Sequence, residues 1–260
     1  MSLTFDNIKN ALHIADICKN NKTIGQVNYI NEDDVEGQAL TKIRLNNKDE
    51  AFFPKITEWT ESNKQLDRIY ICGTSGCGKS RWIRAYIQRF KIRYPKSKVL
   101  LFSSKLEDEM LDDLPIERVK IDDEIHINPF TLEEIVAKSR PILAVFDDIE
   151  DFKTKKINAE VARLRDEIMR NGRSYGIYSV FVHHDPCSYR DTKHMLFECT
   201  KIVMFPKQCG RGTFNYLMES KLRLSKKIIN MLNTLNSNYV CVNKGVPPYI
   251  ISDKYIILDK

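Results

Sequence analysis

The segment GTSGCGKS, residues 73–80, constrains the fold of this chain more than any other part of its sequence. It matches the pattern GxxxxGK[ST] at every position, with the strand-like run Arg68–Cys72 before it and an amphipathic stretch after it. Such a loop needs a strand that ends in a tight turn and a helix that begins at once, so that backbone N–H groups converge on a phosphate. The pattern therefore predicts a parallel α/β sheet and a site for a nucleoside triphosphate.

Each residue of this loop is a candidate for binding the nucleotide. The predicted phosphate site consists of Gly73, Thr74, Ser75, Gly76, Cys77, Gly78, Lys79 and Ser80. Lys79 is expected to contact the β- and γ-phosphates of ATP, and the Ser80 hydroxyl is expected to bind Mg²⁺. Cys77 is expected to contribute its backbone N–H, with its thiol exposed to solvent.

From residue 67 onward, short apolar runs alternate with helical stretches, the pattern of a parallel sheet covered by helices. The expected strands are Arg68–Cys72, Lys98–Ser103, Ile142–Phe146, Ile177–Val182 and Lys201–Phe205. The expected helices are 79–93, 155–171, with Asn-Gly at 171–172 as its end, and a helical pair over about 213–236. The remaining tail is typical of hairpin strands.

Residues 1–66 differ from the rest of the chain. They contain strand-like pieces separated by polar turns, with a weak helical period near Ile8, Leu12 and Ile14. We therefore expect an accessory β-rich segment at 1–66, and a P-loop ATPase core with a C-terminal helical and hairpin part at 67–260.

The segment PILAVFDDIED supplies acidic candidates at the end of a buried strand. Asp147 should lie beside the phosphate loop and hold Mg²⁺. Asp148 suits a general base or a group that orients water, and Glu150 is the alternative for that role. A carboxylate next to the Mg²⁺ ligand favours a hydrolysing ATPase with an added catalytic strand over a simple kinase.

After the next strand, the sequence HHDP places two histidines at the strand tip. In ATPases of this layout, a polar residue at the tip senses the γ-phosphate, and either His183 or His184 could donate that hydrogen bond. The alternative is a strand end that merely exposes polar side chains. A metal cluster with Asp185 and Cys187 fits no standard zinc spacing.

Several basic residues are candidates for contacts outside the nucleotide site. Arg170 and Arg173 end the helix after the acidic strand, and Arg173 is the first choice for an arginine that reaches a neighbouring subunit, although helix ends also carry Arg for dipole reasons. Candidate DNA contacts are Lys153, Lys155, Lys156, Lys207 and Arg211, with Lys221, Arg223, Lys226 and Lys227 in the same C-terminal cluster. Such clusters can also be solvated faces.

The composition restricts the class of protein but does not identify a partner. The net charge of +6 and the pI near 8.8 permit a polyanionic partner. Seven cysteines without a CxxC pair disfavour a disulfide framework or a zinc ribbon and indicate a reducing, intracellular compartment. No run approaches the roughly 18 apolar residues of a membrane span, and the N-terminus lacks the pattern of a secretory signal, so no membrane insertion is expected.

These motifs together resemble the virion DNA-packaging ATPases of poxviruses, other large nucleocytoplasmic DNA viruses and virophages, a branch of the FtsK–HerA superfamily. The resemblance runs from about Phe52 to about Phe205. It rests on GTSGCGKS, LLFSS, AVFDDIED, NGRSYGIYSVFVHH and TKIVMFP, in this order and spacing.

The resemblance implies a RecA-like (ASCE) core in a pentameric or hexameric ring that moves double-stranded DNA into a capsid with ATP and Mg²⁺. It implies a place in the host cytoplasm, the viral factory or the virion, and capsid or portal proteins as partners. Family roles would fall on Lys79, Ser80, Asp147, Asp148 and Arg173. The superfamily usually has Glu where Asp148 stands and Gln at the histidine strand tip, so this chain departs from the family pattern at both positions. A P-loop nucleotide or small-molecule kinase and a nucleotide-gated adaptor like a helicase loader remain alternatives.

Overall fold

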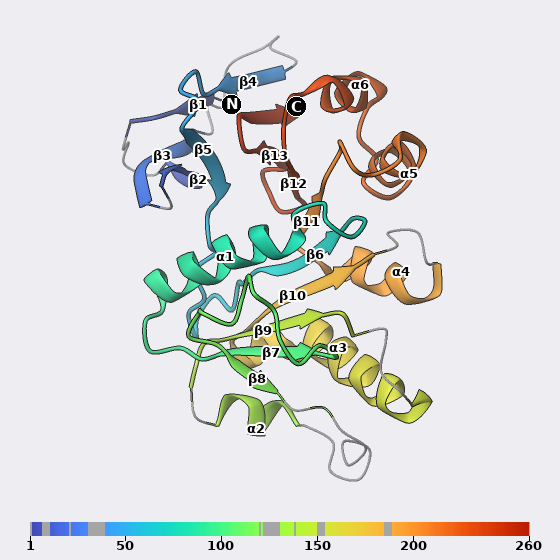
Figure 1. The fold of residues 1–260 in the computed structure, drawn as a ribbon. Coiled ribbons are helices and arrows are strands. Elements are labelled where there is room, and N and C mark those ends of the chain that lie inside the picture. The colour runs from blue at the N-terminus through green and yellow to red at the C-terminus, as the bar shows by residue number, and fades with distance from the viewer. Residues whose placement is uncertain are drawn as a thin grey trace. The chain divides into compact units, whose positions relative to one another are not determined.

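The computed structural model shows two compact units, one formed by residues 56–200 and the other by residues 1–55 with 201–260 (Figure 1). The structure describes residues 2–6, 11–20, 22–30, 40–119, 121, 131–137, 139–149, 154–184 and 189–259. The division differs from the predicted segments 1–66 and 67–260, because the C-terminal strands share a core with the N-terminal ones. None of the helices in the described ranges is both long and apolar enough to cross a bilayer.

The unit of residues 56–200 is built on parallel strands. These are β6 (Arg68–Cys72), β10 (Ile177–His183), β9 (Ile142–Asp147), β7 (Val99–Ser103) and β8 (Glu117–Val119), in that spatial order. Every neighbouring pair among them is parallel. Strands β9 and β10 are buried at every residue, as a sheet covered on both faces requires. The predicted RecA-like α/β class is confirmed, and the strands start within one residue of their predicted positions.

Helices connect and cover these strands. They are α1 (Lys79–Arg93), α2 (Leu132–Val136), α3 (Lys155–Tyr175) and α4 (Tyr189–Glu198). The connection β6–α1–β7 crosses the sheet in one direction and β9–α3–β10 in the other, so right-handed crossovers place α1 and α3 on opposite faces (Figure 1). Helix α1 has the predicted bounds, and its apolar side chains Ile83, Tyr86, Ile87 and Phe90 are buried.

The predicted end of the second helix at 171–172 is wrong, because α3 continues to Tyr175. Gly172 lies inside the last turns, where an added Cβ would come within 3.2 Å of the Ile177 carbonyl oxygen. Gly176 ends the helix instead, with φ of 72° and its N–H donating to the carbonyls of Gly172 and Arg173. The first glycine therefore permits close packing, and the second supplies the left-handed C-cap.

The other unit consists of two sets of antiparallel strands and a helical segment. One set is a sheet with the order β1 (Ser2–Thr4), β3 (Lys22–Ile30), β2 (Leu12–Lys19) and β5 (Glu50–Pro54). The other set contains the consecutive neighbours β4 (Leu40–Arg44), β14 (Tyr255–Asp259), β13 (Tyr249–Ser252), β12 (Val240–Asn243) and β11 (Lys201–Met204). The helical segment comprises α5 (Arg211–Tyr216), the π-helix η2 (Leu217–Lys221) and α6 (Lys226–Thr234). The C-terminal hairpins are thus as predicted.

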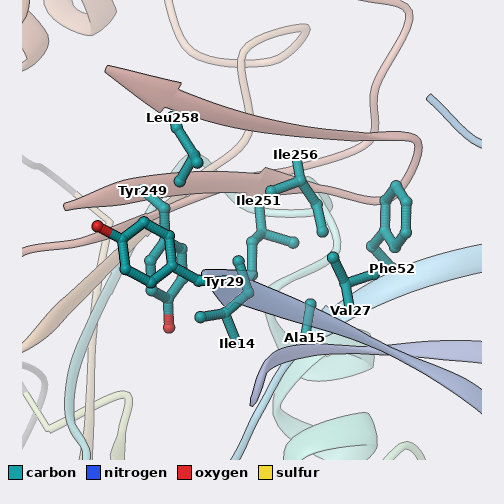
Figure 2. Close-up of a cluster of buried hydrophobic side chains, with 9 residues drawn as sticks. All are labelled: Ile14, Ala15, Val27, Tyr29, Phe52, Tyr249, Ile251, Ile256 and Leu258. Atoms are coloured by element: carbon teal, nitrogen blue, oxygen red, sulfur yellow. The ribbon is translucent and has the colours of Figure 1, made fainter. Parts of the chain in front are cut away.

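A shared hydrophobic core joins the two ends of the chain in this unit (Figure 2). Side chains of β2, β3 and β5 pack against side chains of β13 and β14: Ile14, Ala15, Val27, Tyr29 and Phe52 against Tyr249, Ile251, Ile256 and Leu258. The weak helical period read near Leu12 and Ile14 is wrong, because these residues belong to strand β2; Ile8 lies outside the described residues. The cross-strand burial of this apolar set explains why it forms a sheet.

Candidate nucleotide site

The loop between β6 and α1 has the backbone shape of a phosphate-binding loop. Gly76 has φ of 76° and Gly78 has φ of 106°, conformations that glycine adopts without the steric cost of a Cβ. Gly78 at the N-cap of α1 has no side chain that could compete for the first N–H groups of the helix. These groups, at the positive end of the helix dipole, are suited to a phosphate.

Lys79 is turned back onto this loop. Its side chain is buried at 8% exposure, and its Nζ donates to the carbonyl oxygens of Gly73 at 2.8 Å and Thr74 at 3.0 Å. Nζ also lies 3.3 Å from Nδ1 of His184. The ammonium group is thus held where the loop closes, and a bound phosphate would compete with these acceptors for its protons.

The other loop residues differ in their exposure to solvent. Thr74, Ser75 and Gly76 are exposed and Ser80 is half-buried. Cys77 is buried at 6% exposure, and this burial raises the pKa of its thiol. The expectation of a solvent-exposed thiol is therefore wrong, because the side chain of Cys77 is buried.

Strand β10 lies between β6 and β9, which is the added-strand layout expected of a hydrolysing ATPase. His183 at the end of β10 is in register with Cys72 at the end of β6, and its carbonyl accepts a hydrogen bond from Gly73 N–H at 3.2 Å. The start of the phosphate loop is thus tied to the tip of β10. Side chains at this tip lie between the loop and the acidic end of β9.

Asp147 is the last residue of β9 and is buried at 5% exposure. Burial, reinforced by the neighbouring charge of Asp148, raises the pKa of Asp147 to about 6. Burial makes the ionised form of this carboxylate unfavourable, so a bound cation would stabilise it. The carboxylate of Asp147 and the hydroxyl of Ser80 are the oxygen donors that suit Mg²⁺, so the predicted pair fits this ion.

Asp148 points in a different direction, because its φ of 51° turns the chain after the strand. Its Oδ1 lies 2.9 Å from Nε2 of His184, and its Oδ2 pairs with Nζ of Lys105. Burial would raise the pKa of Asp148, but the hydrogen bonds from His184 and Lys105 outweigh this effect and lower it. Glu150, the alternative water-activating residue, lies outside the described residues.

The two histidines at the strand tip have different surroundings. His183 is buried at 1% exposure, with its ring 5.6 Å from that of Tyr70. His184 is exposed and contacts both Lys79 and Asp148. The structure therefore places His184, and not the His183 ring, at these two groups. Among the described side chains there is no metal-binding group of three or more His, Cys, Asp or Glu, and Asp185 and Cys187 fall outside them.

Lys105 is a site residue that the sequence reasoning missed. It follows β7, the strand beside β9, and its ammonium group pairs with Asp148 although its side chain is 58% exposed. The only signal in the sequence is its position just after a predicted strand, since parallel strands gather their carboxyl ends at one edge.

Arg173 lies far from the nucleotide loop of its own chain. It is exposed in the last turn of α3, which runs for 21 residues from the carboxyl end of β9 to the amino end of β10. A helix of this length spans roughly 30 Å. The Arg173 carbonyl accepts a hydrogen bond from Trp59 Nε1 at 2.8 Å, and Arg170 Nε lies 3.2 Å from His194 Nε2. The structure does not bring either guanidinium to the loop within one chain.

The candidate DNA contacts lie in two separate units. Lys155 and Lys156 are exposed in the first turn of α3, the end that follows Asp148 in the chain, and Lys153 is outside the described residues. Lys207 and Arg211 are exposed in the other unit, where Lys207 Nζ donates to Asn236 Oδ1 at 2.7 Å. Their DNA contacts stay predictions.

Comparisons with known proteins show the family and the fold of this chain. The chain is 32% identical over 184 residues to "Uncharacterized protein V3" of the Sputnik virophage, covering 70% of this chain and 73% of that protein. Its fold is similar to the crystal structure of B204, the DNA-packaging ATPase of Sulfolobus turreted icosahedral virus, with a TM-score of 0.52, 15% identity and coverage of 72% of this chain and 97% of B204. No protein-family model matches the chain.

Proposed function

The chain belongs to the family of the Sputnik virophage protein V3 and has the fold of viral packaging ATPases of the FtsK–HerA type, and on that premise we propose that it is an ATPase that packages viral DNA. Its substrates would be ATP and double-stranded DNA, and its cofactor would be Mg²⁺. The result of its activity would be a capsid filled with DNA. This activity would take place inside the infected cell, with capsid or portal proteins as partners.

The observation that carries the proposal is the row of strand ends at one edge of the parallel sheet. The phosphate loop follows β6, the polar tip of β10 lies next to it, and the two aspartates end β9. One strand, β10, lies between the strand before the loop and the strand that carries the acids, the layout expected of an ATPase that hydrolyses its nucleotide. This order supports hydrolysis over phosphate transfer to an acceptor.

The residues of this edge would divide the chemistry among them. Lys79 and the loop N–H groups would hold the phosphates and offset their charge, and Ser80 and Asp147 would hold Mg²⁺, which neutralises charge on the transferring group. Asp148 would accept a proton from the attacking water while the water oxygen bonds to the γ-phosphorus. The bond from that phosphorus to the bridging oxygen then breaks, and ADP leaves with the electron pair.

Assembly into a ring would complete the site. Arg173 is exposed and remote from the loop of its own chain, which supports a role in the site of a neighbouring copy. Lys155 and Lys156 would contact DNA phosphates from the helix that begins near the acidic strand end, so that hydrolysis and DNA contact are mechanically linked. A homo-pentamer or homo-hexamer would provide such neighbours.

The proposal is tested by ATP hydrolysis of the purified chain with and without linear duplex DNA. We expect DNA to stimulate turnover and Lys79→Ala to lower it by about 100-fold, since it removes a charge aimed at the transferring phosphoryl group. Lys96→Ala is the matched control, because Lys96 is exposed and follows the other end of α1. Wild-type chain that hydrolyses no ATP under either condition would refute the proposal. ATP binding without DNA-stimulated turnover would favour a nucleotide-gated adaptor.

A further inference from the structure

Four polar side chains form a continuous row across the carboxyl ends of four neighbouring strands. We call Lys79, His184, Asp148 and Lys105 the edge row; they follow β6, β10, β9 and β7 respectively. Lys79 Nζ is 3.3 Å from His184 Nδ1, and His184 Nε2 is 2.9 Å from Asp148 Oδ1. Lys105 closes the row through its ion pair with Asp148 Oδ2.

Hydrogen-bond chemistry determines the direction of each contact in the edge row. An ammonium group can only donate, so Nδ1 of His184 must accept from Lys79. The ring proton of His184 then resides on Nε2, which donates to Asp148 Oδ1. With Lys105 donating to Oδ2, both carboxylate oxygens of Asp148 are engaged.

This arrangement has a consequence for catalysis. Each oxygen of Asp148 keeps a second lone pair, but the hydrogen bonds from His184 and Lys105 stabilise the ionised carboxylate and so make it a weaker base. Opening one of these contacts would therefore make Asp148 a better acceptor for the proton of water. The contact to His184 is the one connected to the phosphate loop, because the same imidazole also contacts Lys79.

We propose that His184 couples the phosphate contacts of Lys79 to the availability of Asp148, and that Lys105 holds Asp148 in place from the opposite side. The inference deepens the proposed ATPase function and rests on it. A terminal phosphate that draws Lys79 away removes the donor from Nδ1, so the imidazole can turn and release Oδ1. Lys105 keeps the carboxylate oriented through Oδ2. Both side chains are positioning residues for Asp148.

A kinetic test asks whether Lys105 acts through Asp148. We expect Lys105→Met to lower kcat about 10-fold with the KM for ATP changed less than about two-fold, the size of effect typical of a lost orienting contact. In an Asp148→Asn background the same substitution should cause no further loss. Lys96→Met serves as the matched control. An equal loss in both backgrounds would overturn the assignment.

A second variant pair tests the bridging role of His184. His184→Ala should lower kcat by a similar factor of about 10. His184→Gln should recover most of it, because its side-chain oxygen can accept from Lys79 while its nitrogen donates to Asp148. Equal loss in the Ala and Gln variants would contradict a bridge.

A third measurement needs no hydrolysis and therefore separates this inference from the proposed function. Nitrogen-15 NMR of the imidazoles, with the His184 signals identified from the His184→Gln variant, reports which ring nitrogen carries the proton. We expect the Nε2–H form in nucleotide-free protein, and a changed Nδ1 signal in Lys79→Met and on addition of Mg²⁺ and a non-hydrolysable ATP analogue. An Nδ1 signal unmoved by both changes would overturn the coupling. A signal that moves in a chain without ATPase activity would refute the proposed function and leave the coupling intact.

Discussion

Replacing Asp147 with asparagine should make the nucleotide-free protein more stable at pH 8 while removing the proposed Mg²⁺ ligand. Burial and the charge of Asp148 raise the pKa of Asp147 from 3.8 to about 6. A folded-state pKa above the unfolded value means that the native chain binds more protons. Stability from this group is therefore full below pH 3.8 and is lost as the pH rises through about 6.

The magnitude follows from the same pKa values. The rise of the Asp147 pKa from 3.8 to about 6 corresponds to about 3 kcal/mol of unfolding free energy over the whole titration. Between about pH 4.5 and pH 8, about 2 kcal/mol of this should be lost in the wild type. The asparagine side chain does not titrate, so the Asp147→Asn variant should gain about 2 kcal/mol relative to wild type over that interval.

The assay is urea unfolding followed by circular dichroism at pH 4.5 and pH 8, with EDTA present. All other titratable groups are present in both proteins. The change in the stability difference between variant and wild type from pH 4.5 to pH 8 therefore isolates the contribution of Asp147. Asp113→Asn is a useful control, since the Arg84 guanidinium lowers the pKa of this exposed carboxyl and no gain at pH 8 should appear. A stability difference that does not change with pH, or that falls at pH 8, would show that burial does not raise the pKa of Asp147.

Two further predictions concern the helix end and the DNA contacts. Gly176→Ala should destabilise the chain by about 2 kcal/mol in urea unfolding, because φ is 72° and the new Cβ would lie 3.1 Å from the Trp59 ring. Gly212→Ala, where an added Cβ meets open space, should not destabilise it, and equal losses in both variants would contradict this account. Lys155→Glu with Lys156→Glu should weaken duplex binding at least about 10-fold and lower its salt dependence, whereas Lys96→Glu should not. Unchanged DNA affinity in the double variant would show that these lysines do not contact DNA.

The elements that could be predicted from the sequence are those whose signal is local. Helix α1 has its predicted bounds because a glycine-rich turn marks its start and Pro95 follows its end. The end of α3 was misplaced because two glycines stand four residues apart, and only the packing of Gly172 against the next strand shows which one terminates the helix. Local sequence carries no information on that contact.

In the candidate site, too, only the features with a local signal could be predicted from the sequence. The loop, Asp147 and Asp148 each end or follow a recognisable strand, whereas the choice of His184 over His183 depends on which side of β10 each side chain faces. Lys105 is distant from Asp148 in the chain and meets it only because β7 pairs with β9. The joining of the N-terminal and C-terminal strands in one core likewise depends on long-range packing that periodicity does not report.

The proposed function requires that the chain moves along double-stranded DNA with energy from ATP hydrolysis. A triplex-displacement assay tests it directly, because a motor that moves along a duplex strips off a bound third strand. We expect displacement by the wild type with Mg²⁺ and ATP, and none with a non-hydrolysable analogue or with Lys79→Ala. ATP hydrolysis by the wild type without displacement, or displacement by Lys79→Ala, would contradict it.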